Sequence, residues 1–106
     1  MHKFLYFNSG ASGFTDCGAM PVSLLRKMKV NSSSTGIDFI FKDVRGGIGQ
    51  EVNIGVDINT DKVNEVIQAV SDEIRYGKNS LIVVADDTNK QYIHPDITNA
   101  GSIYIG

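Results

Sequence analysis

The chain has 106 residues, which is enough for one domain with a single hydrophobic core and too few for two domains of ordinary size. Ten lysines and arginines stand against twelve aspartates and glutamates, and the formal net charge of −2 excludes a global attraction to nucleic acid or an anionic membrane. Any contact with a polyanion must therefore come from a local patch.

From the cysteine content and the first residues we expect an intracellular protein. Cys17 is the only cysteine, so an intramolecular disulfide is excluded. The apolar run 4–7 is too short for a signal peptide or a membrane span. We expect a soluble protein, and eleven glycines with one clear helix pattern favour a single, mainly β domain over 1–106.

The N-terminal third is predicted to contain two short strands. Residues 4–7 form an apolar strand candidate, and the Ser- and Gly-rich stretch 8–18 is predicted to be a loop. Pro21 can open a helical turn through 22–24. A strand over 25–31 would place Arg26, Met28 and Val30 on one face; a helix over 21–29 is the open alternative.

The central run 37–58 is predicted to be a long antiparallel hairpin. Its second arm places Val52, Ile54, Val56 and Ile58 on one face and polar residues or glycine on the other, which is typical of a half-buried strand. The glycine-rich turn 44–49 joins the arms. It lacks the Lys-Ser or Lys-Thr pair of a P-loop, so we interpret it as a reverse turn and not as a phosphate cradle.

Residues 60–76 carry the pattern of an amphipathic helix. Thr60 is the expected N-cap, and Asp61 would place negative charge at the positive end of the helix dipole. Gly77 is the expected left-handed stop. The apolar stripe, which should pack on the apolar face of the hairpin, consists of Val63, Val66, Ile67, Val70 and Ile74.

The C-terminal part is predicted to form a second hairpin and a final edge strand. Residues 81–85 and 90–94 are its arms, 86–89 its turn, and 102–105 the last strand. The expected fold is therefore mainly β (α+β): a strongly bent antiparallel sheet or small open barrel with one helix.

The sequence of this C-terminal part also carries a resemblance to a known family. The segment 81–95 (LIVVADDTNKQYIHP), then Ile97-Thr98 and Gly101-Ser102-Ile103, resembles the ending of a large family of small ocean-metagenome proteins thought to come from cyanophages. The opening 3–7 (KFLYF) is similar too. Members of that family are similar to Sm-like proteins, whose strongly bent five-stranded sheets form rings through their edge strands and often bind single-stranded RNA.

The resemblance implies five strands at 25–31, 37–42, 50–58, 81–85 and 90–94, with RNA-binding turns at 43–49 and 86–89. The match to the Sm-type RNA motifs is incomplete. The first turn lacks the usual Asp and Asn, and Asp86-Asp87 stands where an Arg-Gly pair is typical. Only Asn89 lies near an expected motif residue, so the resemblance does not imply uridine-specific recognition, and we expect little sequence preference.

Candidate binding residues combine this resemblance with the only basic cluster of the chain. Single-stranded nucleic acid requires positive charge beside stacking rings, which Tyr92 and Phe14 could supply. A solvated strand face with its aromatic residues in the core is the competing interpretation. The predicted nucleic-acid-binding residues are Arg26, Lys27, Lys29, Lys42, Arg45, Asn89, Lys90 and Tyr92.

Catalytic and metal sites are not predicted. His94 and Asp96, with Asp86 and Asp87, lack the spacing of a calcium loop and the His or Cys content of a zinc site. Cys17 with His2 or His94 shows no recognisable nucleophile spacing. No cofactor and no enzymatic activity are expected.

Two functions follow as hypotheses. The first is a homo-oligomeric Sm-like ring that binds single-stranded RNA or DNA. The second is a phage virion or assembly protein that acts only through protein contacts, because open edges are expected at 37–58 and 102–105. Either function would place the protein in the host cytoplasm or in the virion, without a membrane partner.

Overall fold

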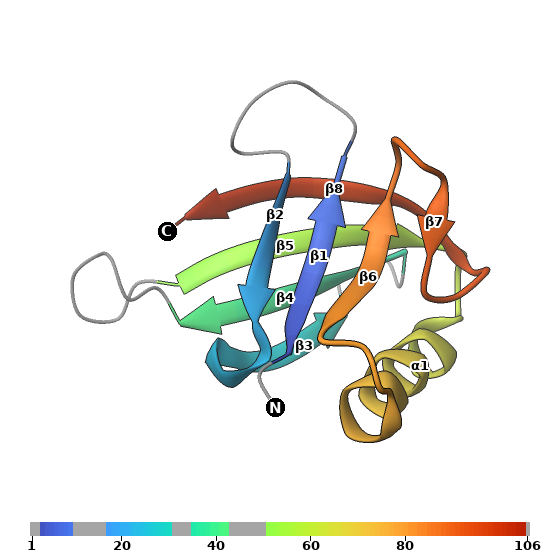
Figure 1. The fold of residues 1–106 in the computed structure, drawn as a ribbon. Helices are drawn as coiled ribbons and strands as arrows, with labels where there is room; N and C mark the ends of the chain where they lie inside the picture. Colours follow the sequence, from blue (N-terminus) through green and yellow to red (C-terminus); the bar gives the residue numbers. More distant parts are fainter. Residues whose placement is uncertain (1–2, 10–16, 31–34, 43–50, 106) are drawn as a thin grey trace.

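The computed structural model describes residues 3–9, 17–30, 35–42 and 51–105, and the ribbon in Figure 1 follows them. Within these residues the strands form two four-stranded sheets, and the predicted mainly β domain with one helix is confirmed. The glycine-rich turn of the central hairpin lies outside the described residues.

The first sheet, which we call sheet A, has the strand order β2-β1-β6-β7. Its strands are β1 (Phe4–Asn8), β2 (Cys17–Pro21), β6 (Leu81–Asp86) and β7 (Gln91–Tyr92). β1 lies antiparallel to β2 and parallel to β6, with Phe4 opposite Leu81. The expectation of a purely antiparallel sheet is therefore wrong for this pair, as is the prediction of a loop at 17–18.

The second sheet, sheet B, has the order β3-β4-β5-β8, and all its neighbouring strands are antiparallel. Its strands are β3 (Leu25–Val30), β4 (Gly36–Lys42), β5 (Glu51–Ile58) and β8 (Ile97–Ile105). The strand prediction for 25–31 is confirmed over its described residues 25–30, and the predicted helical turn over 22–24 is confirmed as a 3-10 helix (Val22–Leu24). The alternative of a helix over 21–29 is wrong. β8 is an edge strand as expected, whereas β4 and β5 are interior strands and offer no open edge.

The five strands assigned from the resemblance do not share one sheet. β3, β4 and β5 belong to sheet B, while β6 and β7 belong to sheet A. The physical reason is that β6 pairs with β1, which the resemblance did not count among the five strands. The β6–β7 hairpin therefore belongs to sheet A and does not continue sheet B. The Sm-like assignment itself stays a prediction.

The core fills the space between the two sheets, whose strands run across one another (Figure 1). β5 follows the period-2 rule, with every second residue buried, whereas β4 buries Ile40 in addition to Ile37, Phe39 and Phe41. Phe7 packs against the rings of Phe39 and Phe41, with centroid distances of 5.1 and 6.4 Å. The predicted inward face of the hairpin, Val52 to Ile58, is buried as expected.

Helix α1 (Val63–Tyr76) lies nearest to β6 and closes one side of the layer (Figure 1). Val66 and Val70 are fully buried, and the rest of the predicted stripe packs against the core, so the stripe is confirmed. The predicted C-terminal end is confirmed, because Gly77 directly follows the helix, but the predicted N-cap Thr60 and the left-handed conformation of Gly77 are wrong. Lys62 is the N-cap residue, and the cap Gly77 has an extended backbone (φ −69°, ψ 155°) and not a left-handed one.

A lysine side chain closes the C-terminus of α1 in place of a left-handed glycine. The ammonium group of Lys3 donates to the carbonyl oxygens of Glu73, Ile74 and Gly77 at 3.2, 2.8 and 2.7 Å. The last carbonyls of a helix lack partners within the helix and carry partial negative charge, so a cation there is favourable. The contact ties α1 to the residue that precedes β1.

Candidate nucleic-acid interface

Four of the predicted cations lie together along one margin of sheet B. We call this group, Arg26, Lys27, Lys29 and Lys42, the cationic edge; all four are exposed. The first three lie on β3, the outermost strand of the sheet, and Lys42 ends the neighbouring β4. The sequence cluster is thus a contiguous surface feature.

A β-bulge in β3 decides where these side chains point. The register passes from Leu25 opposite Phe41 to Lys27 opposite Ile40, so Arg26 is the additional residue. Leu25 and Met28 consequently both pack against the core. The predicted alternation, which put Arg26 and Met28 on one face, is wrong because the bulge shifts the pleat by one residue.

Acidic side chains on the neighbouring strands offset part of this charge. Arg26 forms an ion pair with Glu51 at 3.5 Å, and its side chain is 53% exposed. Such a surface pair contributes at most about 1 kcal/mol, so the guanidinium can exchange it for a phosphate. Asp38 lies opposite Lys29 in the register. The acidic side chains that lie near this group therefore belong to β4 and β5, and β3 itself carries only positive charges.

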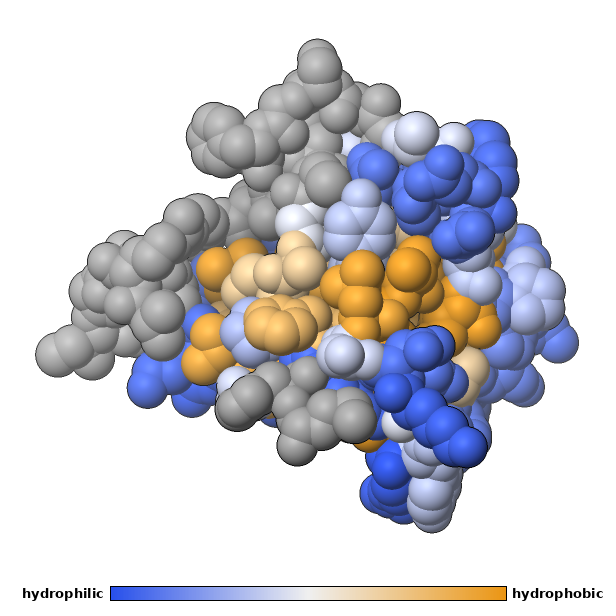
Figure 2. Space-filling view, in the orientation of Figure 1, coloured by the Kyte–Doolittle hydropathy of each residue, from blue (hydrophilic) through white to orange (hydrophobic). Residues whose placement is uncertain are grey.

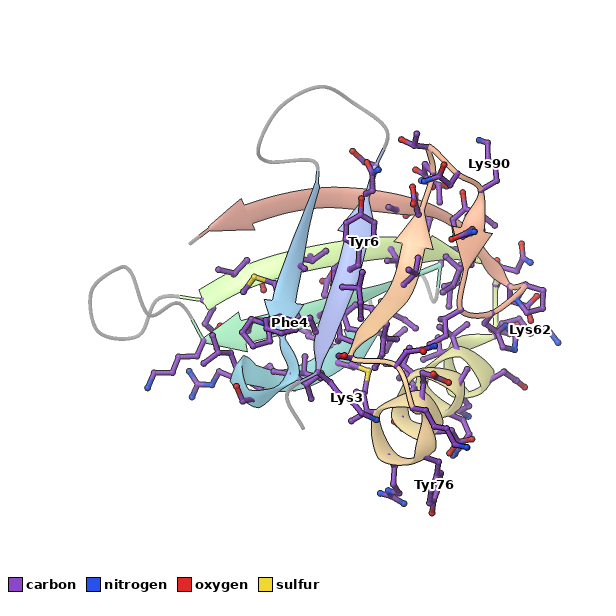
Figure 3. All side chains as sticks on the ribbon, viewed as in Figure 1. Lys3, Phe4, Tyr6, Lys62, Tyr76 and Lys90 are labelled. Atoms are coloured by element: carbon purple, nitrogen blue, oxygen red, sulfur yellow. The ribbon has the colours of Figure 1, made fainter. Side chains whose placement is uncertain are left out.

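The other predicted binding residues lie elsewhere. Asn89, Lys90 and Tyr92 belong to the β6–β7 hairpin of sheet A, and Lys90 lies at the tip of that hairpin (Figure 3). Arg45 and Phe14 lie outside the described residues. The structure therefore splits the predicted site between two sheets, because β6 and β7 do not continue sheet B.

Asn89 is held by the buried carboxylate of Asp86. Asp86 is 4% exposed and accepts hydrogen bonds from Asn89 Nδ2 at 2.9 Å, from the backbone amides of Thr88 and Asn89, and from Asn8 Nδ2. The pKa of Asp86 is lowered, and the hydrogen bond from the Asn89 side chain is the largest cause. Burial alone would raise this pKa, but the hydrogen bonds together outweigh it. The predicted turn at 86–89 is confirmed, and the side-chain amide of Asn89 is held within it by Asp86.

Tyr92 is held in the same way by Asp87. Its hydroxyl donates to Asp87 Oδ1 at 2.6 Å, which together with desolvation raises the pKa of Tyr92 to about 12. The same carboxylate accepts the backbone amide of Ala100 in β8 at 3.0 and 3.2 Å. Asp87 therefore links the edge of sheet A to sheet B, and Tyr92 serves this link instead of presenting a free ring.

Of the described residues considered for metal binding, His94 and Asp96 lie side by side, with 3.5 Å between His94 Nδ1 and a carboxylate oxygen of Asp96. His94 Nδ1 accepts the backbone amide of Asp96 at 3.1 Å in a local turn. In the part of the chain that the structure describes, no group of three or more His, Cys, Asp or Glu side chains is placed to hold a metal ion. His2 and the Cys17 side chain lie outside that part.

Comparison with known proteins adds no homologue. No family model, no curated protein and no solved structure matches this chain. The cyanophage and Sm-like assignments thus rest on the sequence resemblance alone. Across residues 3–9, 17–30, 35–42 and 51–105, no helix is both long and apolar enough to span a membrane.

Sequence reasoning missed a second surface, the outward face of sheet A. Phe4 and Leu81 are 38% and 50% exposed and lie opposite one another on β1 and β6. Figure 2 shows apolar side chains gathered over these strands. We call this surface the apolar face; its outward positions are Ala19, Pro21, Phe4, Tyr6, Leu81 and Val83. The sequence 4–7 is uniformly apolar and gave no signal for an outward face; the structure buries Leu5 and Phe7 and leaves Phe4 exposed.

Proposed function

We propose that this chain is a non-enzymatic module that binds single-stranded nucleic acid with little sequence preference through its cationic edge. The observation that carries the proposal is the exposure of Arg26, Lys27 and Lys29 on one edge strand, with Lys42 beside them. Phosphate contacts of this kind supply affinity without reading bases.

The size of the edge sets the expected strength. A six-residue strand spans roughly 20 Å, which allows three or four phosphate contacts. For single strands the logarithm of the binding constant falls by about 0.7 per contact and per tenfold rise in salt. Binding should therefore weaken roughly 20- to 50-fold between about 50 and 200 mM salt.

Edge protection is the competing explanation of the same residues. Lysines and a β-bulge on an outer strand also prevent unwanted pairing with other sheets, and β3 has both. The two explanations differ in a measurable way, because edge protection requires no affinity for a polyanion.

The experiment is an anisotropy titration of a labelled single-stranded oligonucleotide, RNA and DNA in parallel, at about 50 mM salt. Lys27→Gln/Lys29→Gln is compared with Lys62→Gln/Lys78→Gln, which removes two exposed lysines elsewhere and leaves the same net charge. Loss of two phosphate contacts should weaken binding by up to roughly 70-fold at this salt concentration, and the control pair should change it little. Absence of wild-type binding, or equal losses in both pairs, would refute the proposal.

A second candidate function is a phage virion or assembly protein that acts only through protein contacts. The apolar face favours it, because exposed apolar patches with a polar rim mark interaction surfaces. Stoichiometric recovery of the chain in purified phage particles, combined with no affinity for oligonucleotides, would establish this function in place of the first. A phage origin and a location in host cytoplasm or virion belong to both proposals.

A further inference from the structure

The apolar face lies on the opposite side of the molecule from sheet B and takes no part in the proposed nucleic-acid contact. Its six outward positions belong to three adjacent strands: β1 is in the middle, with β2 and β6 on either side. None of the six is charged. Single exposed apolar residues are ordinary, but a contiguous set on three strands is not.

The side chain of Lys3, which precedes the face in the chain, points away from it. Lys3 directly precedes Phe4, yet its ammonium group is held by the three carbonyl oxygens at the end of α1. Figure 3 shows Lys3 reaching toward the helix while Phe4 and Tyr6 lie along β1. The contact therefore stabilises α1 and also directs the positive charge of Lys3 away from the apolar face.

We propose that the apolar face is the contact surface between two copies of this chain, related by a two-fold axis. In such an interface every side chain meets the same set from its partner, so a charge near the axis would meet its own like charge. The outer face of sheet B would bring Lys27 and Lys29 against their own copies. The apolar face carries no such penalty, although each copy has a net charge of −2.

The extent of the face predicts a weak and reversible dimer. Three strands spaced about 4.8 Å apart and four residues long present on the order of 200 Å² of flat surface. Stable complexes bury about 800 Å² per partner, so even with contributions from the rim this dimer belongs to the transient class. Dimerisation would leave both cationic edges free, and two edges on one particle would raise the avidity for a single strand.

The test is sedimentation velocity of the full chain from about 1 to 200 µM, a range that covers micromolar dissociation constants. The average mass of the wild type should rise with concentration. Leu81→Lys and Phe4→Lys should remain monomeric over the same range. Val30→Lys is the matched control, because Val30 is 40% exposed on β3, away from the apolar face, and receives the same charge. Thermal melts of all variants verify that they fold.

The same experiments distinguish a second copy of the chain from other partners of the apolar face. A monomeric wild type at the highest concentration, or a Leu81→Lys variant that dimerises as the wild type does, overturns the proposal. If Phe4→Ala loses affinity for an oligonucleotide while the mass of the wild type never rises, the face stacks bases and not a second copy. The proposal does not depend on the cationic edge, since the Lys27→Gln/Lys29→Gln variant should still dimerise.

Discussion

The carboxylate of Asp87 should be a major determinant of stability, because it joins the two sheets. It accepts one hydrogen bond from Tyr92 of sheet A and one from the backbone of Ala100 in sheet B. Each hydrogen bond to a charged group contributes roughly 1.5 to 3 kcal/mol, and the half-buried position favours the lower part of that range. Asp87→Ala should therefore reduce the free energy of unfolding by about 3 kcal/mol, or roughly 15 °C in Tm.

The free energy of unfolding is measured by chemical denaturation. Two further variants, Tyr92→Phe and Asp57→Ala, show whether the loss comes from the contacts between the sheets. Tyr92→Phe removes only one of the two bonds and should cost about 1 to 2 kcal/mol. The double variant should cost less than the sum of the two single variants, since both remove the same bond. Asp57→Ala is the matched control: its carboxylate also contacts β8, through Asn99 Nδ2 at 2.7 Å, but is exposed and should contribute less than about 1 kcal/mol.

The titration of Tyr92 gives an independent reading of the same contact. The pKa of about 12 lies above the ordinary value near 10, so this contribution to stability is complete below pH 10 and is lost as the pH rises toward 12. Asp87→Asn should lower this pKa, as measured by tyrosinate absorbance against Tyr92→Phe. If Asp87→Ala unfolds no more readily than Asp57→Ala, the carboxylate does not hold the sheets together.

Two further predictions concern the core. Val70→Asp places a carboxylate at a fully buried position of α1 and should destabilise the fold by at least about 4 kcal/mol. Asn64→Asp, on the exposed side of the same helix, should be nearly neutral. Similar urea midpoints for the two variants would contradict the assigned helix face. Gly101→Ala would bring a methyl group to 2.7 Å from the backbone oxygen of Gly55 and should cost about 1 to 3 kcal/mol of stability. The reciprocal Gly55→Ala meets only the movable Asp38 side chain, at 3.3 Å, and should cost less. Thermal melts should therefore show Gly101→Ala as the less stable variant, and the reverse order would refute the assigned approach of β5 and β8.

Predictions from sequence succeeded where the signal was local and repetitive. The alternation of Val52 to Ile58 and the helical spacing of Val63 to Ile74 each report which side of an element is buried. Two errors in the N-terminal third arose from non-local effects. β2 has little strand propensity and forms by pairing with β1, and the β3 bulge reverses the face of Met28.

The candidate site shows the same division. The sequence identified the cationic edge, because neighbouring charges on one strand stay together in any fold. It could not show that Asn89 and Tyr92 are held by Asp86 and Asp87, nor that β7 lies in the other sheet. The apolar face was missed because Phe4 appears in the sequence as part of a uniformly apolar strand.

The sequence by itself determined the mainly β composition, the central hairpin and the buried stripe of α1, since each follows from the periodicity of side chains along one element. Only the tertiary structure decided that β1 pairs in parallel with β6, that Lys3 closes α1, and that Asp87 joins the two sheets. These contacts join residues far apart in the chain. They depend on strand order and loop closure, and neither is encoded in the spacing of neighbouring residues.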